Sequence, residues 1–261
     1  MNAPIYNYNT SSQSILFNWT AVDAFDTGLL CNITINNKVN FSNIQSLNAT
    51  PTTQTINGFN EGNYLWNVTC MDNATNVNSS ETRLLTVDMT PPVITLNTAN
   101  DTWQRDGNIT LRFIASDSRG IDSCVLFGDF NNSWLVNQTK AGILSGIQNN
   151  FSINLSNRTY LWNVRCNDTV GNFNFSMSNY TFTIDSVPPA ITLLVPAHNA
   201  QVGRRARFNF TVIDNLDKGL KCNLTLDGKV NVSDINAING SVTNLSIQGI
   251  NDTVHYWNVT C

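Results

Sequence analysis

The chain has 261 residues, a formal net charge of −4 at pH 7, a sequence pI of about 5.0 and only 12% charged residues. An acidic chain with so few lysines and arginines is not expected to bind nucleic acid, because that affinity comes from neutralising phosphates. It has no stretch of about 18 apolar residues that could span a membrane. Its first residues, MNAPIYNYNTSS, lack the basic and apolar regions of a signal peptide.

One phrase occurs three times along the chain. YLWNVTC covers residues 64–70, YLWNVRC residues 160–166 and HYWNVTC residues 255–261, so its tryptophan recurs at intervals of 96 and 95 residues. The segments VDMTPPVITL at 87–96 and IDSVPPAITL at 184–193 match as well. A period of this length indicates tandem copies of one unit, each the size of a small β-sandwich. We predict three domains, at residues 1–88, 89–185 and 186–261.

Each repeat opens with a segment in which apolar and polar residues alternate, as on a half-buried strand. In ILFNWTAVD, residues 15–23, Phe17, Trp19 and Ala21 share one face. Matching segments are ITLRFIASD at 109–117 and ARFNFTVID at 206–214. The repeated Trp-x-x-x-Cys phrase alternates too, which places its tryptophan and cysteine on one face of a core strand.

The second repeat shows the expected strand order most completely. The strands A, B, C, E, F and G of an immunoglobulin-like (Ig-like) sandwich are predicted at 92–97, 108–117, 122–129, 150–156, 159–168 and 179–185. The paired prolines at each joint restrict the backbone, so we expect a semi-rigid rod. The predicted fold is all-β: three tandem Ig-like β-sandwich domains, the third lacking its last strand because it stops at Cys261.

The joints and turns carry a family resemblance over the whole chain. The joint VDMTPPVITL, the segment ASDSRGID at 115–122 and the turn CNDTVGNFN at 166–174 resemble the tandem Ig-like repeats of large bacterial and archaeal surface proteins. The resemblance implies a cell-surface, non-catalytic role. The cysteines fall on the expected C and F strands and the tryptophan on F, which departs from antibody-type domains.

Each repeat contains two cysteines, about 40 residues apart. The repeat predicts one disulfide per unit, which implies an oxidising compartment outside the cytosol. Buried free thiols are the alternative, and the spacing does not suit a metal site. The predicted pairs are Cys31–Cys70, Cys124–Cys166 and Cys222–Cys261.

Asparagine sequons, Asn-x-Ser/Thr, occur about 25 times, roughly threefold more often than random placement gives. Polar alternation on strands could explain some of them, because positions i and i+2 share a face. It does not explain the sequons expected in loops, so we predict covalent N-glycans. The strand candidates are Asn18, Asn67, Asn209 and Asn258, and the loop candidates are Asn48, Asn73, Asn100, Asn137 and Asn239.

Aspartates gather around the two predicted joints. Carboxylates that converge there could hold a structural Ca²⁺, which prefers six to eight oxygen ligands. A simpler interpretation is that they only form Asx turns. The calcium candidates are Asp88, Asp117, Asp122 and Asp168 at the first joint, and Asp185, Asp214 and Asp217 at the second.

No catalytic motif is recognisable, and the only two histidines, His198 and His255, lie in unrelated contexts. We therefore expect no enzyme, but an extracellular structural glycoprotein of the cell surface that forms a stalk, surface layer or filament, or presents an adhesive surface. The composition resembles that of archaeal surface proteins. The alternative is a spacer or glycan-binding array attached to a secreted enzyme, with Trp103 and Trp134 as the aromatic ligand contacts.

The third repeat has no counterpart of the last strand of the other two. If the protein is extracellular, the chain is expected to be a mature form or a piece of a longer array. The other possibility is strand donation, in which a strand of another copy or another surface protein completes the third sandwich.

Overall fold

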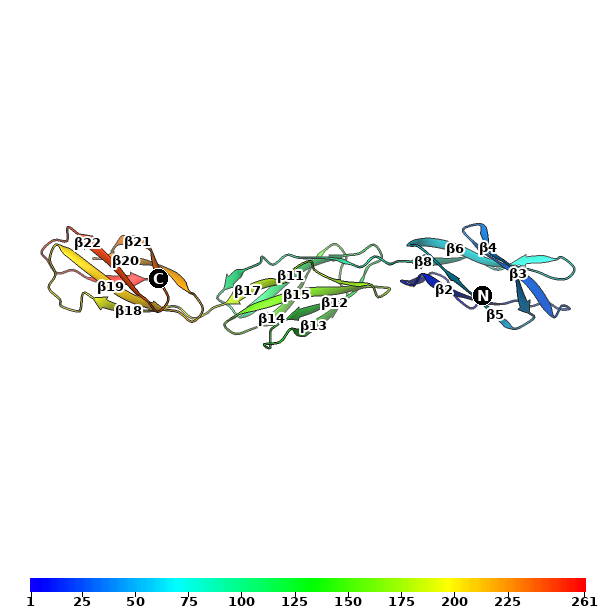
Figure 1. The fold of residues 1–261 in the computed structure, drawn as a ribbon, viewed down its shortest axis with the longest axis horizontal. Helices are drawn as coiled ribbons and strands as arrows, with labels where there is room; N and C mark the ends of the chain where they lie inside the picture. Colours follow the sequence, from blue (N-terminus) through cyan, green and yellow to red (C-terminus); the bar gives the residue numbers. More distant parts are fainter. The chain divides into compact units, whose positions relative to one another are not determined.

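The computed structural model describes residues 1–261 and contains 23 strands and no helix (Figure 1). The all-β prediction is confirmed. No helix capable of crossing a membrane is present. The chain divides into two compact units, and the predicted three-domain boundaries stay a prediction. The first unit comprises Met1–Ala99, Thr110–Phe151 and Leu161–Tyr180, and the second comprises Asn100–Ile109, Ser152–Tyr160 and Thr181–Cys261.

The first repeat forms a two-layer sandwich. One sheet has the order β1-β8-β6-β3-β4, with β7 paired to β6, and the other consists of β2 and β5. In Ig terms, β8, β6 and β3 are the G, F and C strands. The bounds are β1 Tyr8–Thr10, β2 Ser14–Thr20, β3 Gly28–Ile35, β4 Lys38–Leu47, β5 Pro51–Asn57, β6 Gly62–Met71, β7 Val77–Ser79 and β8 Arg83–Val87.

The second repeat has the same strand order. Its larger sheet runs β10-β17-β15-β12-β13, with β16 paired to β15, and its smaller sheet runs β14-β11-β9. The bounds are β9 Val93–Leu96, β10 Thr102–Gln104, β11 Asn108–Ser116, β12 Ile121–Gly128, β13 Leu135–Ala141, β14 Gln148–Asn154, β15 Arg158–Asp168, β16 Phe173–Phe175 and β17 Tyr180–Ile184.

The third repeat has two three-stranded sheets, β18-β19-β22 and β21-β20-β23. Its F strand, β23, is the last strand of the chain and lies at a sheet edge. The bounds are β18 Ala190–Val195, β19 Arg205–Ile213, β20 Gly219–Leu226, β21 Lys229–Ile238, β22 Val242–Gln248 and β23 Trp257–Thr260.

The predicted alternation builds the cores. Phe17 and Trp19 of β2 are buried. The Phe17 ring packs edge-on against the Trp66 ring of β6, with 4.7 Å between the ring centroids. The third repeat repeats this contact between Phe208 and Trp257, at 5.1 Å. Because these pairs join a strand of one sheet to a strand of the other, the recurring tryptophan holds the two layers together.

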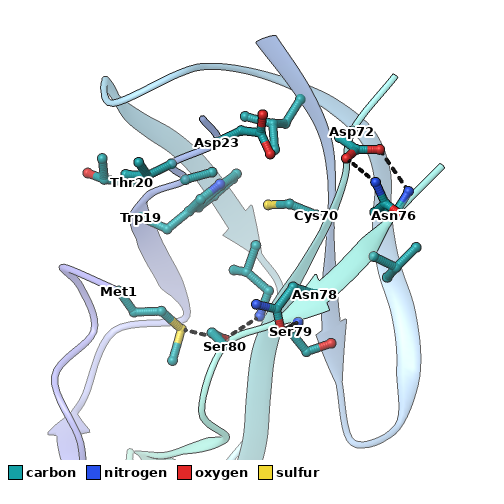
Figure 2. Close-up of a pocket in the computed structure, with 15 residues that line it drawn as sticks. Met1, Trp19, Thr20, Asp23, Cys70, Asp72, Asn76, Asn78, Ser79 and Ser80 are labelled. Atoms are coloured by element: carbon teal, nitrogen blue, oxygen red, sulfur yellow. Dashed lines mark hydrogen bonds between the residues drawn. The ribbon is translucent and has the colours of Figure 1, made fainter. Parts of the chain in front are cut away.

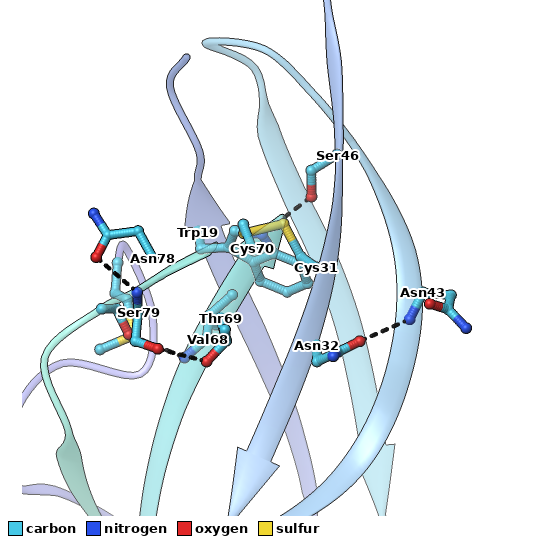
Figure 3. The surroundings of a disulfide bond; sticks show 12 residues. Trp19, Cys31, Asn32, Asn43, Ser46, Val68, Thr69, Cys70, Asn78 and Ser79 are labelled. Carbon is cyan, nitrogen blue, oxygen red and sulfur yellow. Dashed lines mark hydrogen bonds between the residues drawn. A yellow bond between two sulfur atoms is a disulfide. The ribbon is translucent and has the colours of Figure 1, made fainter. Parts of the chain in front are cut away.

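The six cysteines form the three disulfides that the repeat predicts. Cys31 of β3 and Cys70 of β6 are direct partners in the antiparallel ladder, as are Cys124 and Cys166. The bond therefore joins neighbouring strands of one sheet (Figure 3), whereas the antibody-type bond crosses between sheets. In the chain-entropy model, closing a loop of this length contributes about 4 kcal/mol.

Candidate metal centres

Three aspartates that are far apart in the sequence converge in the first compact unit. Asp88 follows β8, Asp117 follows β11 and Asp168 ends β15. One carboxylate oxygen from each lies within 4.8 Å of the others. We call these residues the first aspartate cluster. Their convergence agrees with the sequence expectation for three of the four aspartates assigned to this joint.

The fourth, Asp122, does not reach the cluster. It is exposed on β12, and its carboxylate accepts a hydrogen bond from the Ser123 hydroxyl at 3.0 Å. Asp117 precedes the turn that connects β11 to β12, whereas Asp122 already belongs to the strand that leads away from that turn. The sequence placed both at the same turn because it could not show where the strand begins.

Asp168 is held by the turn that follows it. Its Oδ1 accepts hydrogen bonds from the backbone N–H groups of Val170 and Asn172, both at 2.9 Å. The Asn172 side-chain amide donates to Asp168 Oδ2 at 2.7 Å and to the Asp88 carbonyl at 2.9 Å. Asn172 therefore ties the turn after β15 to the segment after β8, and brings two aspartates of the cluster together.

Asp88 is one of two buried members of the cluster, with an exposed fraction of 1%, and Asp168 is the other. Asp88 Oδ1 accepts a 3.2 Å hydrogen bond from the Thr90 N–H, but Asp88 Oδ2 is buried with no partner. Burial raises the pKa of the Asp88 carboxyl above its ordinary value, and the neighbouring carboxylates raise it further. No lysine or arginine forms an ion pair with the cluster.

The first cluster fits a hard divalent cation. A buried carboxylate oxygen without a partner is costly unless something compensates it. Three carboxylates that approach one another without a counter-charge repel, and a Ca²⁺ ion surrounded by oxygen ligands would reverse the sign of that interaction. Asp88, Asp117 and Asp168 would supply the carboxylates, and Asn172 would orient the Asp168 carboxylate from outside while it holds the Asp88 backbone.

The second aspartate cluster lies in the second compact unit. Asp185, Asp214 and Asp217 again bring one carboxylate oxygen each within 4.8 Å of the others, and all three are partly exposed. Burial raises the pKa of the Asp217 carboxyl, with smaller contributions from Asp214 and Asp185. The three aspartates, with Trp103 and Arg105, line a cavity of about 230 Å³.

The first repeat carries the same turn elements beside a larger cavity. Asp72 accepts hydrogen bonds from the backbone and the side chain of Asn76, both at 2.7 Å, as Asp168 does from Asn172. Figure 2 shows Asp23, Asp72 and Cys70 around this cavity of about 340 Å³. The cavity contains no histidine and no recognisable pair of nucleophile and base, and it supports no catalytic assignment.

The nine asparagines chosen as glycan acceptors are all partly or fully exposed. Asn137 was expected in a loop but lies within β13, beside the irregularity where Leu126 pairs with Gln138 and Phe127 with Val136. Asn73 donates its side-chain amide to Asp26 at 2.8 Å. The Asn100 side-chain Oδ1 accepts the Thr181 backbone N–H at 2.7 Å.

Trp134 belongs to an aromatic surface on the outer face of the β12–β15 sheet. Its ring stacks on the Phe127 ring with 6.4 Å between their centroids, and the Phe127 and Phe175 ring centroids lie 5.0 Å apart. The Arg165 guanidinium lies 5.5 Å from the Phe127 ring and 5.3 Å from the Phe173 ring. Sequence reasoning missed this surface because its residues come from β12, β15 and β16 and from the segment before β13. Trp103 is exposed on β10.

No family model and no curated relative matches the chain. Among solved structures, the chain is similar to the fibronectin(III)-like modules of Clostridium thermocellum CbhA, with 14% identity over 70% of this chain and 92% of that one, and a TM-score of 0.41. It is similar to a marsupial T cell receptor, with 10% identity over 93% and 98% of the two chains and a TM-score of 0.45. It is also similar to a 1.5-MDa bacterial ice-binding adhesin, with 13% identity over 92% and 82% and a TM-score of 0.41. No functional conclusion follows from similarities at this level.

Proposed function

We propose that the chain is a non-catalytic structural segment of an extracellular, cell-surface glycoprotein. The observation that carries this proposal is the same intra-sheet disulfide in every repeat. Disulfides persist in oxidising compartments and are rare in the cytosol. The sequon density and the low charge support the same location, because glycans can keep a surface soluble where lysines and glutamates are few.

The first aspartate cluster gives this segment a cation-dependent element. Asp88 follows the last strand of the first repeat, while Asp117 and Asp168 belong to the second. A divalent cation bound by all three would restrain one repeat against the next within this compact unit. The second cluster has a matching composition, and we propose the same role for it. A restrained array suits a stalk or surface layer. Association with other copies by strand addition stays a prediction.

The location is tested on intact cells of the source organism. An antibody raised against the recombinant chain should label unpermeabilised cells as strongly as permeabilised ones. Labelling that appears only after permeabilisation would contradict an extracellular role. An antibody against a cytosolic protein of the same cells, which should label only permeabilised cells, is the matched control.

A second candidate function is sugar binding by the aromatic surface around Trp134. The Trp134 and Phe173 rings are 39% and 59% exposed, and exposed aromatic faces can stack on sugars. A glycan array probed with the whole chain should then give signals that the double substitution Trp134→Ala and Phe173→Ala removes. Trp103→Ala is the control outside this surface. An array without signals would rule out this candidate for the sugars displayed.

A further inference from the structure

Two sequon asparagines at equivalent positions of the first and third repeats hold a turn in place. The Asn48 side-chain amide donates to the Asp23 and Asp26 carbonyls, both at 2.7 Å, and its Oδ1 accepts the Asp23 N–H at 3.0 Å. The Asn239 amide donates to the Asp214 and Asp217 carbonyls at 2.7 and 2.6 Å. Each side chain therefore clamps the turn between the B and C strands.

In the middle repeat a different residue makes the contacts to the first aspartate of this turn. The Ser145 hydroxyl accepts the Asp117 N–H at 3.1 Å and donates to the Asp117 carbonyl at 3.2 Å. The position thus contacts the aspartate after the B strand in all three repeats. In the middle repeat this position is a serine and carries no sequon. The contact with the turn is therefore what the three repeats share, and the sequon is not.

The clamp and an N-glycan compete for the same atom. A side-chain amide nitrogen has two hydrogens, and Asn48 and Asn239 use both as donors. N-glycosylation replaces one of these hydrogens by a bond to the sugar. A glycosylated Asn48 would leave one turn carbonyl without its donor and would place a sugar where the Asp23 or Asp26 backbone lies.

Two other sequon asparagines present the opposite arrangement. Asn32 of β3 uses only its Oδ1, which accepts the Asn43 N–H at 2.9 Å (Figure 3). Asn223 of β20 likewise accepts the Asp234 N–H at 3.0 Å. The side-chain nitrogens of both asparagines form no hydrogen bond, and both residues are partly exposed. The carbonyl contact survives glycosylation, because the sugar bonds to nitrogen and leaves the oxygen free to accept.

The face of the sheet also suits the modification. Thr34 and Thr225, the third residues of these two sequons, stand two positions along the same strands and on the same outer face. The middle repeat has Val125 and Phe127 at the corresponding positions and no sequon there. The chain therefore contains one repeat that should lack this glycan and two that should have it.

We infer that Asn32 and Asn223 are N-glycan acceptors, and that Asn48 and Asn239 are structural clamps that stay unmodified in the folded protein. The inference rests on the proposed extracellular function. It concerns which amide nitrogens a glycosylating cell can modify in a chain that still folds, so it can be tested in any secreting host.

The test is site-specific occupancy in the whole chain secreted from a eukaryotic cell line that performs N-glycosylation. The folded fraction is treated with peptide N-glycosidase F in ¹⁸O water, and the labelled aspartates are located by peptide mass spectrometry. Label is expected at positions 32 and 223 and absent at 48 and 239. Label at 48 or 239, or its absence at 32 and 223, would overturn the inference. Thr34→Ala should remove the label at 32 and Thr34→Ser should keep it.

A second measurement tests the clamp without any glycan. In protein made in bacteria with its disulfides formed, Asn48→Gln should lower the melting temperature by about 5 °C or more, because the longer side chain loses the clamp bonds. Asn48→Ser should retain most of the stability, as Ser145 does in the middle repeat. Equal melting temperatures for the two variants would refute the clamp. Failure of the proposed function would appear separately, as an unmodified chain in native material.

Discussion

The imidazole Nε2 of His255 lies 2.9 Å from the carbonyl oxygen of Asn251, four residues earlier in the chain. In the other two repeats a tyrosine makes this contact: the Tyr64 and Tyr160 hydroxyls donate, each at 3.0 Å, to the carbonyls of Asn60 and Ser156. The contact resembles the tyrosine corner of Ig-type sandwiches, in which a tyrosine hydroxyl bonds to the backbone a few residues upstream. His255 therefore performs a structural task of the repeat.

His255 also introduces a pH dependence that a tyrosine would not have. Its Nδ1 lies 2.6 Å from Asp227 Oδ2, so both ring nitrogens face oxygen acceptors and the protonated ring is favoured. The hydrogen bond to Asp227 raises the pKa of His255 above its ordinary value of 6.5. The stability that the His255–Asp227 contact gives the folded chain is therefore complete below pH 6.5. It is lost as the pH rises through the raised pKa of His255.

Asp227 determines how the stability from this contact changes at acidic pH. The pKa of Asp227 is lowered, first by the hydrogen bond from the Tyr256 N–H and then by the bond to His255. The stability that the Asp227 carboxylate gives the folded chain is therefore present above pH 3.8 and is lost as the pH falls through its lowered pKa. An NMR titration should place the pKa of His255 above 6.5, and Asp227→Asn should bring it down. A value of 6.5 or less in the unsubstituted chain would contradict the contact. His255→Tyr should remove the pH dependence in this range.

The disulfides are expected to differ in their access to a reductant. Cys124 and Cys166 are both fully buried, whereas Cys70 is partly exposed and lines the cavity of the first repeat (Figure 2). Under native conditions dithiothreitol should open Cys31–Cys70 before Cys124–Cys166. Timed alkylation followed by peptide mass spectrometry gives the order directly. Simultaneous loss of both bonds would indicate that reduction requires global unfolding.

The Ser145 clamp should support both the fold and the first aspartate cluster. Ser145→Ala leaves the Asp117 N–H and carbonyl without this partner, and each lost hydrogen bond costs about 1 kcal/mol. Urea denaturation should therefore show a free energy of unfolding lower by about 1–2 kcal/mol. Ser145→Asn, which imitates Asn48 and Asn239, should recover it. An alanine variant as stable as the parent would show that Ser145 does not stabilise the turn.

Calcium should stabilise the chain through Asp88. In calcium the melting temperature should exceed that in EGTA, because an ion that binds only the folded state stabilises it. Asp88→Asn should reduce that difference to the contribution of the second cluster, without lowering the melting temperature in EGTA, since it removes one of three mutually repelling carboxylates. Asp122→Asn, outside the cluster, should leave the calcium effect intact. A parent chain that melts at the same temperature in calcium and EGTA would exclude the cation proposal.

Much of the fold was predictable because it is written in short-range patterns. The alternation around Phe17 and Trp19 predicted which face of β2 is buried, and the internal repeat predicted the disulfide partners. The repeat also located the aspartates, since Asp88 and Asp185 directly follow the equivalent strands β8 and β17. These features depend on residues close in sequence or on comparison of one repeat with another.

The features that were missed depend on residues brought together by folding. β10 pairs in parallel with β17 across about 80 residues, and its three-residue length left no periodicity to detect. The clamps at Asn48 and Asn239 looked like loop sequons, because a sequence does not show where an amide nitrogen points. The exclusion of Asp122 depends on where β12 begins. Each of these features depends on where a group lies or points in the folded chain.

Mass spectrometry of the chain isolated from its native source tests the central claim most directly. Intact mass and peptide mapping report the state of all six cysteines and the occupancy of every sequon in one experiment. The proposed extracellular structural role predicts three disulfides, no free thiol and several N-glycans. Reduced cysteines on a chain without glycans would place it in a reducing compartment and contradict that role.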